Sequence, residues 1–203
     1  MIFTAHADGR FDLAGRTTRC ALGRSGVIAA ADKREGDGAS PLGVWPIRRI
    51  LYRPDRIAPP QTRLPVHPIA PDDGWCDAPG DPNYNRPVKL PYPASCEQLW
   101  REDHVYDLVG VLAHNDDPPV PLMGSAIFLH LARPGFEPTE GCVALQVWDI
   151  LQLLALAEPG AAISIVDVNP HPILESVTAL GEAPAARPPR PDVRVLGPGS
   201  EEG

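Results

Sequence analysis

The chain has 203 residues, of which 43% are hydrophobic, and its formal net charge is -8. This length can bury one sizeable core and favours a single domain. The acidic balance argues against sequence-independent nucleic-acid binding, which needs a basic surface. We find no run of about 18 apolar residues and no basic-then-apolar leader. We therefore expect no membrane insertion, and the location and the oligomeric state stay open.

Proline and glycine are frequent, with 26 and 18 copies, and they separate short apolar runs. This composition is typical of strands joined by loops rather than of a helical bundle. Alternating and β-branched residues predict six strands, at Ile2–Ala5, Thr17–Leu22, Val44–Tyr52, Val105–Ala113, Ala126–Leu131 and Ile163–Val168. We expect a mainly β fold with a few short helices.

Two segments are predicted to be helical. Apolar residues form a broad stripe at helical spacing over Val147–Ala157, and a Glu-Pro-Gly stop signal follows. A second, shorter helix is predicted over Ser95–Arg101. From Ala183 onward the sequence holds five prolines and few apolar residues. We therefore expect one domain over residues 1–182 and a Pro-rich flexible tail over residues 183–203.

The loop Lys33–Gly43 contains three glycines and a proline, which demand tight turns. We expect its charged residues Arg34, Glu35 and Asp37 to hold the turn rather than to contact a substrate, because charged turns are usually solvated or internally paired.

Five further residues are candidates for substrate binding. The loop from Asp72 to Arg86 is too long and aromatic for a mere connector, and its residues could either line a groove or form a structured surface loop with buried aromatics. The end of the strand Val105–Ala113 could orient substrate amides or simply open a turn. The possible groove residues of the loop are Trp75, Asp77, Tyr84, Asn85 and Arg86. The candidates are Trp75, Tyr84 and Arg86 in the loop, with Arg86 pairing a carboxylate, and His114 and Asn115 at the strand end.

The segment from Ala126 to Leu145 carries the clearest chemistry. His130 closes an apolar strand, a Pro/Gly loop follows, and Gly141 and Cys142 precede another strand. A thiol needs a neighbouring imidazole or positive dipole to become a good nucleophile, and His130 is the nearest candidate base. Gly141 permits unusual backbone dihedrals, so the amides of Gly141 and Cys142 could form an oxyanion hole. Alone, this spacing is more typical of buried structural residues than of a catalytic pair.

Two motifs together resemble the catalytic domain of the L,D-transpeptidase (YkuD-like) family. That family shows a histidine, a loop and then Ser/Thr-x-Gly-Cys-Val/Ile, which His130 and Thr139–Leu145 match. An upstream Gly-Asp-Gly-x-x-Pro-x-Gly turn is matched within Lys33–Gly43. The two matches lie in the expected order and span most of the region between residues 17 and 168.

The resemblance implies a β-sandwich-like domain that acts on peptidoglycan stem peptides as both donor and acceptor, without a metal or cofactor. Cys142 would form a thioester with the donor, and an amine of a neighbouring stem would resolve it into a 3-3 or 1-3 cross-link. His130 would move the protons, with its other ring nitrogen held by a carbonyl near Leu131. Thr139, in the same motif, is expected to contact substrate.

Two positions depart from the commonest family pattern. Glu140 stands where histidine is frequent, and Ala144 stands where arginine is frequent. An unpaired carboxylate near the thiol would disfavour the thiolate, so we expect Glu140 to point away or to pair with Arg133 or Arg86.

Three alternative readings stay open at this point. The same acyl-enzyme could be resolved by water, which would make the protein an L,D-carboxypeptidase or endopeptidase. A non-catalytic wall-binding module would keep the scaffold without needing His130, Gly141 and Cys142 together. A papain-like protease fits less well, because its cysteine precedes its histidine in the chain.

The other cysteines and histidines show no spacing typical of a metal site. Cys20, Cys76 and Cys96 are interpreted as packing residues, with one disulfide between Cys76 and Cys96 as the alternative.

Overall fold

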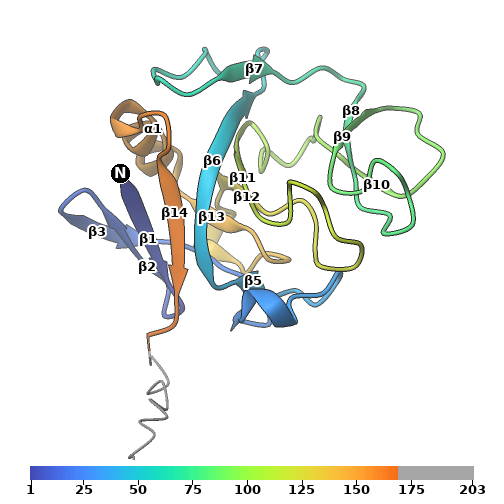
Figure 1. Ribbon diagram of the computed structural model, residues 1–203. Coiled ribbons are helices and arrows are strands. Elements are labelled where there is room, and N and C mark those ends of the chain that lie inside the picture. The colour runs from blue at the N-terminus through green and yellow to red at the C-terminus, as the bar shows by residue number, and fades with distance from the viewer. Residues whose placement is uncertain (169–203) are drawn as a thin grey trace, which may run out of the picture. The chain divides into compact units, whose positions relative to one another are not determined.

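The structure is a computed structural model that describes residues 1–168, and it is mostly β with one α-helix (Figure 1). This confirms the predicted fold class. Each of the six predicted strands overlaps an observed one. The strands are β1 Ile2–His6, β2 Arg10–Leu13, β3 Arg16–Arg19, β4 Val27–Ile28, β5 Ser40–Pro41, β6 Gly43–Tyr52, β7 Val66–Pro68, β8 Asp73–Cys76, β9 Pro87–Lys89, β10 Cys96–Gln98, β11 Leu108–Leu112, β12 Phe128–Leu131, β13 Val143–Leu145 and β14 Ala162–Val166.

The main sheet contains nine strands, in the order β13-β12-β11-β6-β14-β1-β2-β3, with β7 added beside β6. Its two ends meet through an antiparallel bridge between Ala21 and Ala144. Both backbone hydrogen bonds of this bridge, from each amide to the other carbonyl, measure 2.9 Å. The sheet is therefore nearly closed, and the closure lies two residues from Cys142.

The main hydrophobic core lies between this curved sheet and helix α1 (Val147–Leu156). On the helix, Ile150, Leu153 and Leu154 are buried in that core, as the predicted apolar stripe requires. The buried Asp149 accepts hydrogen bonds from Arg16 and from the Thr18 hydroxyl, the latter at 2.7 Å. This contact ties the first turn of α1 to β3.

A separate three-stranded sheet has the order β10-β8-β9. The predicted helix over Ser95–Arg101 is wrong, because residues Cys96–Gln98 pair with β8 as strand β10. A short segment has little helical stability of its own, so pairing with a neighbouring strand decides its conformation. Cys76 and Cys96 lie directly opposite each other, and both are free thiols.

Among residues 1–168, no helix is long and apolar enough to cross a membrane. The predicted tail over residues 183–203 lies outside the described residues, so it stays a prediction, as does the domain boundary at residue 182.

Candidate active site

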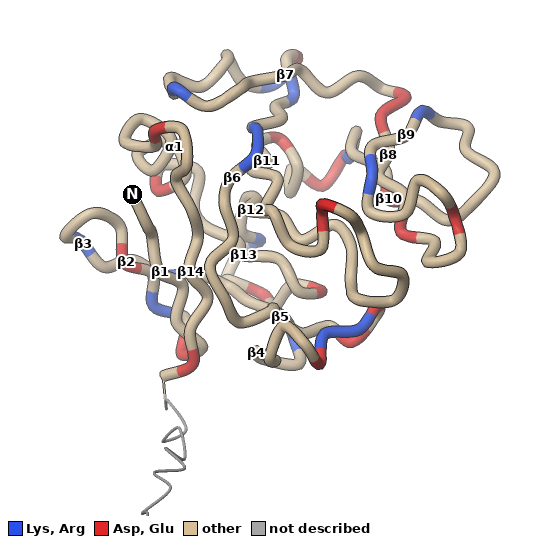
Figure 2. Tube along the Cα trace, in the orientation of Figure 1, with Lys and Arg blue, Asp and Glu red and all other residues tan. Residues whose placement is uncertain are grey.

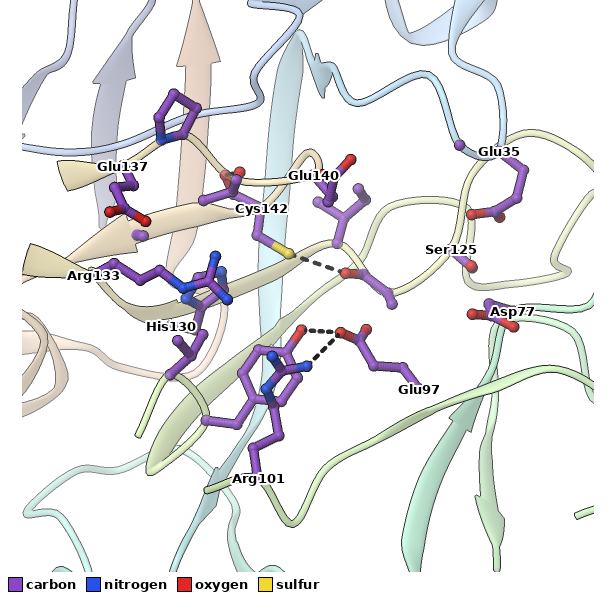
Figure 3. Close-up of a pocket in the computed structure, with 18 of the residues that line it drawn as sticks. Glu35, Asp77, Glu97, Arg101, Ser125, His130, Arg133, Glu137, Glu140 and Cys142 are labelled. Carbon is purple, nitrogen blue, oxygen red and sulfur yellow. Dashed lines mark hydrogen bonds and ion pairs between the residues drawn. The ribbon is translucent and has the colours of Figure 1, made fainter. Parts of the chain in front are cut away.

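Cys142 and His130 lie on neighbouring parallel strands. In the register of β12 with β13, His130 is opposite Ala144 and Leu129 is opposite Val143. Because side chains alternate between the two faces of a sheet, Cys142 and Ala144 share a face with His130. Cys142 and His130 both line one cavity of about 410 Å³ (Figure 3). The fold thus brings the two predicted residues to one site.

The Cys142 thiol is held by backbone groups on the neighbouring strand segment. Its Sγ donates to the Ala126 carbonyl at 3.2 Å and accepts from the Phe128 amide at 3.3 Å. The side chain is buried, and burial raises the pKa of the thiol to about 12, with the Glu97 carboxylate adding to the effect. The sulfur is therefore protonated at rest.

His130 is oriented by a hydrogen bond with the backbone. Its Nδ1 lies 2.9 Å from the carbonyl oxygen of Leu131, which was the predicted partner. Because a carbonyl only accepts, Nδ1 must carry the hydrogen, and Nε2 keeps its lone pair. Burial lowers the pKa of His130 to about 4. The ring is therefore neutral at neutral pH and can accept a proton at Nε2.

Gly141 is required by a backbone contact. Its φ is +134°, and a Cβ at this position would stand 2.9 Å from the carbonyl oxygen of Ala39. Its amide donates to the Thr139 hydroxyl at 3.1 Å, and that hydroxyl donates to the Cys142 carbonyl at 2.7 Å. An oxyanion hole using the Gly141 amide stays a prediction, and it requires this amide to leave Thr139.

The hydroxyl of Thr139 is bonded to the backbone, and its expected contact with substrate stays a prediction. Thr139 lines the cavity, but its hydroxyl is occupied by the backbone of Gly141 and Cys142. The Thr139 amide donates to the Leu22 carbonyl at 2.9 Å, and the Thr139 carbonyl accepts from the Arg24 amide at 2.8 Å. Thr139 therefore braces the turn that presents Cys142.

Asp37 holds the glycine-rich turn, as predicted. Its carboxylate accepts hydrogen bonds from the Lys33 ammonium at 2.6 Å, from the Arg34 amide at 2.7 Å and from the Ala39 amide at 2.9 Å. The Lys33 side chain is only 3% exposed. This buried ion pair fixes the position of Ala39, and therefore the contact between Ala39 and Gly141.

The aromatic residues of the long loop are placed differently from the predicted groove. Trp75 is buried, packs edge-on against Phe128 and donates to the Asn85 side chain. Tyr84 is buried and its hydroxyl donates to Glu35. Neither lines the Cys142 cavity. Tyr84 therefore fits the alternative interpretation of a structured loop with buried aromatics, whereas Trp75 also lines a second cavity with Asn85 and Arg86, so its binding role stays a prediction.

The other three candidates also lie outside the Cys142 cavity. Arg86 borders a second cavity, which Trp75 also lines. His114 is buried, and its Nε2 lies 3.0 Å from the Met123 carbonyl. The Asn115 amide donates to the backbone carbonyls of Val120 and Gly124, at 3.0 and 2.8 Å. The side-chain amide of Asn115 therefore shapes its own loop, and a role in orienting a substrate stays a prediction.

Glu140 points away from the thiol, as expected, but its partner is different. It pairs with Arg24 at 2.9 Å rather than with Arg133 or Arg86, and its side chain is 74% exposed. Arg133 instead contacts Asp103 at 3.2 Å. The partner was missed because Arg24 reaches this turn only through the bridge that closes the sheet.

Several cavity residues escaped sequence analysis. The Tyr106 hydroxyl donates to the Glu97 carboxylate at 2.6 Å, and the Arg101 guanidinium lies 3.7 Å from the same carboxylate. Arg101 also donates two hydrogen bonds to Asp103. Ser125 also lines the cavity, and so does Asp77, which the sequence had placed among the residues of a possible groove. No local motif marks these residues, since Glu97 reaches the site only because β10 pairs with β8.

The sequence model of one family, described as the L,D-transpeptidase catalytic domain, matches residues 5–168. Comparison with curated proteins and with solved structures gave no match. The matched range contains the cavity, the glycine-rich turn and the sheet that joins them.

Proposed function

Because the chain belongs to the L,D-transpeptidase catalytic domain family, whose members act on peptidoglycan stem peptides, we propose that it cross-links such peptides through a thioester on Cys142. The observation that carries the proposal is that a protonated thiol, Cys142, and a neutral imidazole, His130, line the same cavity. A nucleophile and a base of this kind are what acyl transfer requires.

In the first step, the thiol leaves the Ala126 carbonyl and gives its proton to Nε2 of His130. The sulfur attacks the carbonyl carbon that follows the L-centre of a diacid residue in the donor stem. The C–N bond then breaks, the leaving D-amino acid takes the proton from His130, and a thioester remains on Cys142. The hydrogen bond from Nδ1 to Leu131 keeps Nε2 directed at these transfers.

In the second step, an amine of a neighbouring stem attacks the thioester carbonyl. The C–S bond breaks, an amide forms, and the proton that the attacking nitrogen loses passes by way of His130 to the sulfur. Attack by water instead of the amine would make the protein a carboxypeptidase or endopeptidase. The register of the donor stem decides between a 3-3 and a 1-3 cross-link.

Incubation of the purified protein with disaccharide-tetrapeptides separates these outcomes by product mass. Dimers indicate cross-linking, and shortened monomers indicate hydrolysis. Mass spectrometry of the intact protein detects the acyl group on Cys142. If neither product nor adduct forms with a folded protein, the proposal is wrong and a non-catalytic wall-binding role takes its place.

A further inference from the structure

The charged residues of the Cys142 cavity are divided between two ends. In Figure 3, Glu35, Ser125 and Asp77 lie together on the side away from His130, and Glu97 lies between them and Arg101. We call the group Glu35, Asp77, Glu97 and Ser125 the acidic end of the cavity. The nearby cations are already engaged, because Lys33 pairs with Asp37 and Arg101 with Asp103. The acidic end therefore has an excess of hydrogen-bond acceptors.

Two buried polar atoms of the acidic end have no hydrogen-bond partner. They are Oδ1 of Asp77 and Oγ of Ser125. Ser125 is only 8% exposed, and the neighbouring Tyr84 hydroxyl gives its hydrogen to Glu35. Buried polar groups in folded proteins are almost always satisfied. The Asp77 oxygen lacks a donor and the Ser125 hydroxyl lacks a partner, which indicates that a polar ligand binds on this wall of the cavity.

We propose that the acidic end binds the acceptor amine as its ammonium ion, with Asp77 and Ser125 as the principal contacts. This inference rests on the proposed function, which requires an amine to enter the same cavity after the thioester forms. A primary ammonium has three donors and no acceptor, and it suits an acidic wall that lacks a free cation. Binding there holds the amine beside the thioester.

The ammonium must lose a proton before it can attack, and Glu97 can accept it. Burial raises the pKa of the Glu97 carboxyl, and the Tyr106 hydroxyl fixes one of its oxygens at 2.6 Å. The proton passes from nitrogen to the Glu97 carboxylate, and the freed lone pair forms the new C–N bond as the C–S bond breaks. Glu97 returns the proton to solvent afterwards.

The test compares Asp77→Asn with Asp72→Asn. Both substitutions remove one negative charge from a residue next to strand β8, but Asp72 is half-exposed, pairs with Lys89 and does not line the cavity. Acylation of Cys142 by a tetrapeptide donor is measured by intact mass, and transfer is measured by titrating a disaccharide-tripeptide that carries a diamino acid. For Asp77→Asn we expect unchanged acylation, an acceptor KM raised about tenfold and more hydrolysis, since losing a charged hydrogen-bond partner typically weakens binding by this order. Asp72→Asn should behave like the unchanged protein.

Hydroxylamine separates binding from structural damage, because it is uncharged at neutral pH and attacks thioesters without needing an ammonium site. Asp77→Asn and Ser125→Ala should both use hydroxylamine as well as the unchanged protein does. An adduct on Cys142 together with an unchanged acceptor KM in Asp77→Asn would overturn the acidic-end assignment alone. Equal losses with hydroxylamine and with the stem acceptor would also overturn it. If the unchanged protein forms no adduct, the proposed function fails, and the subsite fails with it.

Discussion

The carbonyl oxygen of Ala39 lies 2.9 Å from the point where a Cβ would stand on Gly141. This contact joins the two motifs by which the sequence resembles its family, although they are about a hundred residues apart in the chain. The backbone of the glycine-rich turn, at Ala39, contacts Gly141, the residue before Cys142. The two motifs are therefore parts of one structure, in which the turn fixes the position of the nucleophile.

We expect Gly141→Ala to lower the free energy of unfolding by roughly 2–4 kcal/mol and to slow acylation of Cys142. The added methyl group meets the Ala39 carbonyl, and the φ of +134° is unfavourable for alanine. Gly160→Ala is the matched control, because Gly160 also has a positive φ but nothing lies within 4 Å of its added Cβ. Urea unfolding checks both variants, and equal losses in the two would show that the Ala39 contact is unimportant.

Cys142→Ala should abolish both the products and the covalent adduct, and it should leave the fold intact. The reason is that the proposed reaction has one nucleophile, whose removal leaves no sulfur in the cavity. Cys20→Ala is the control, since burial raises the pKa of the Cys20 thiol to about 12 and Cys20 is absent from the cavity lining. Circular dichroism verifies folding, and normal turnover by Cys142→Ala would rule out the mechanism.

Asp37→Ala should destabilise the protein by about 3 kcal/mol, because it leaves the buried Lys33 ammonium without its carboxylate. The double variant Lys33→Met with Asp37→Ala should recover part of this loss, since no buried charge then lacks a partner. Urea unfolding of the single and double variants measures the difference. If the double variant is no more stable than Asp37→Ala, the hydrogen bonds from Asp37 to the Arg34 and Ala39 amides, and not the ion pair, hold the turn.

The features that could be predicted from sequence are local ones. The helix at Val147 and the strand that ends near His130 follow from residue periodicity. Cys142 and His130 belong to one motif, in which they are only twelve residues apart. Asp37 was assigned correctly to the turn because a charged residue among glycines has few other partners. Each of these predictions depends on neighbours in the chain.

The features that were missed depend on contacts between distant segments. Strand β10 was taken for a helix because its conformation is decided by pairing with β8. The same pairing brings Glu97 to the cavity, and the closure through Ala21 brings Arg24 to Glu140. Trp75 and Tyr84 were candidates for a groove because a sequence cannot distinguish an aromatic side chain that lines a cavity from one that is buried beneath it.

The low pKa of His130 makes a prediction about acid stability. Burial lowers this pKa from its usual 6.5 to about 4. Between these two pH values, the imidazole is protonated in the unfolded chain but not in the folded protein. Stability therefore rises with pH between about 4 and 6.5 and is fully present above that window, with a contribution on the order of 3 kcal/mol. His114 contributes in the same direction, because burial lowers its pKa as well.

Urea unfolding of the unchanged protein and of His130→Gln, at several pH values between 4 and 6.5, isolates the contribution of His130 to this pH dependence. The stability curve of His130→Gln should be flatter between pH 4 and 6.5, and parallel curves would show that folding does not lower the pKa of His130.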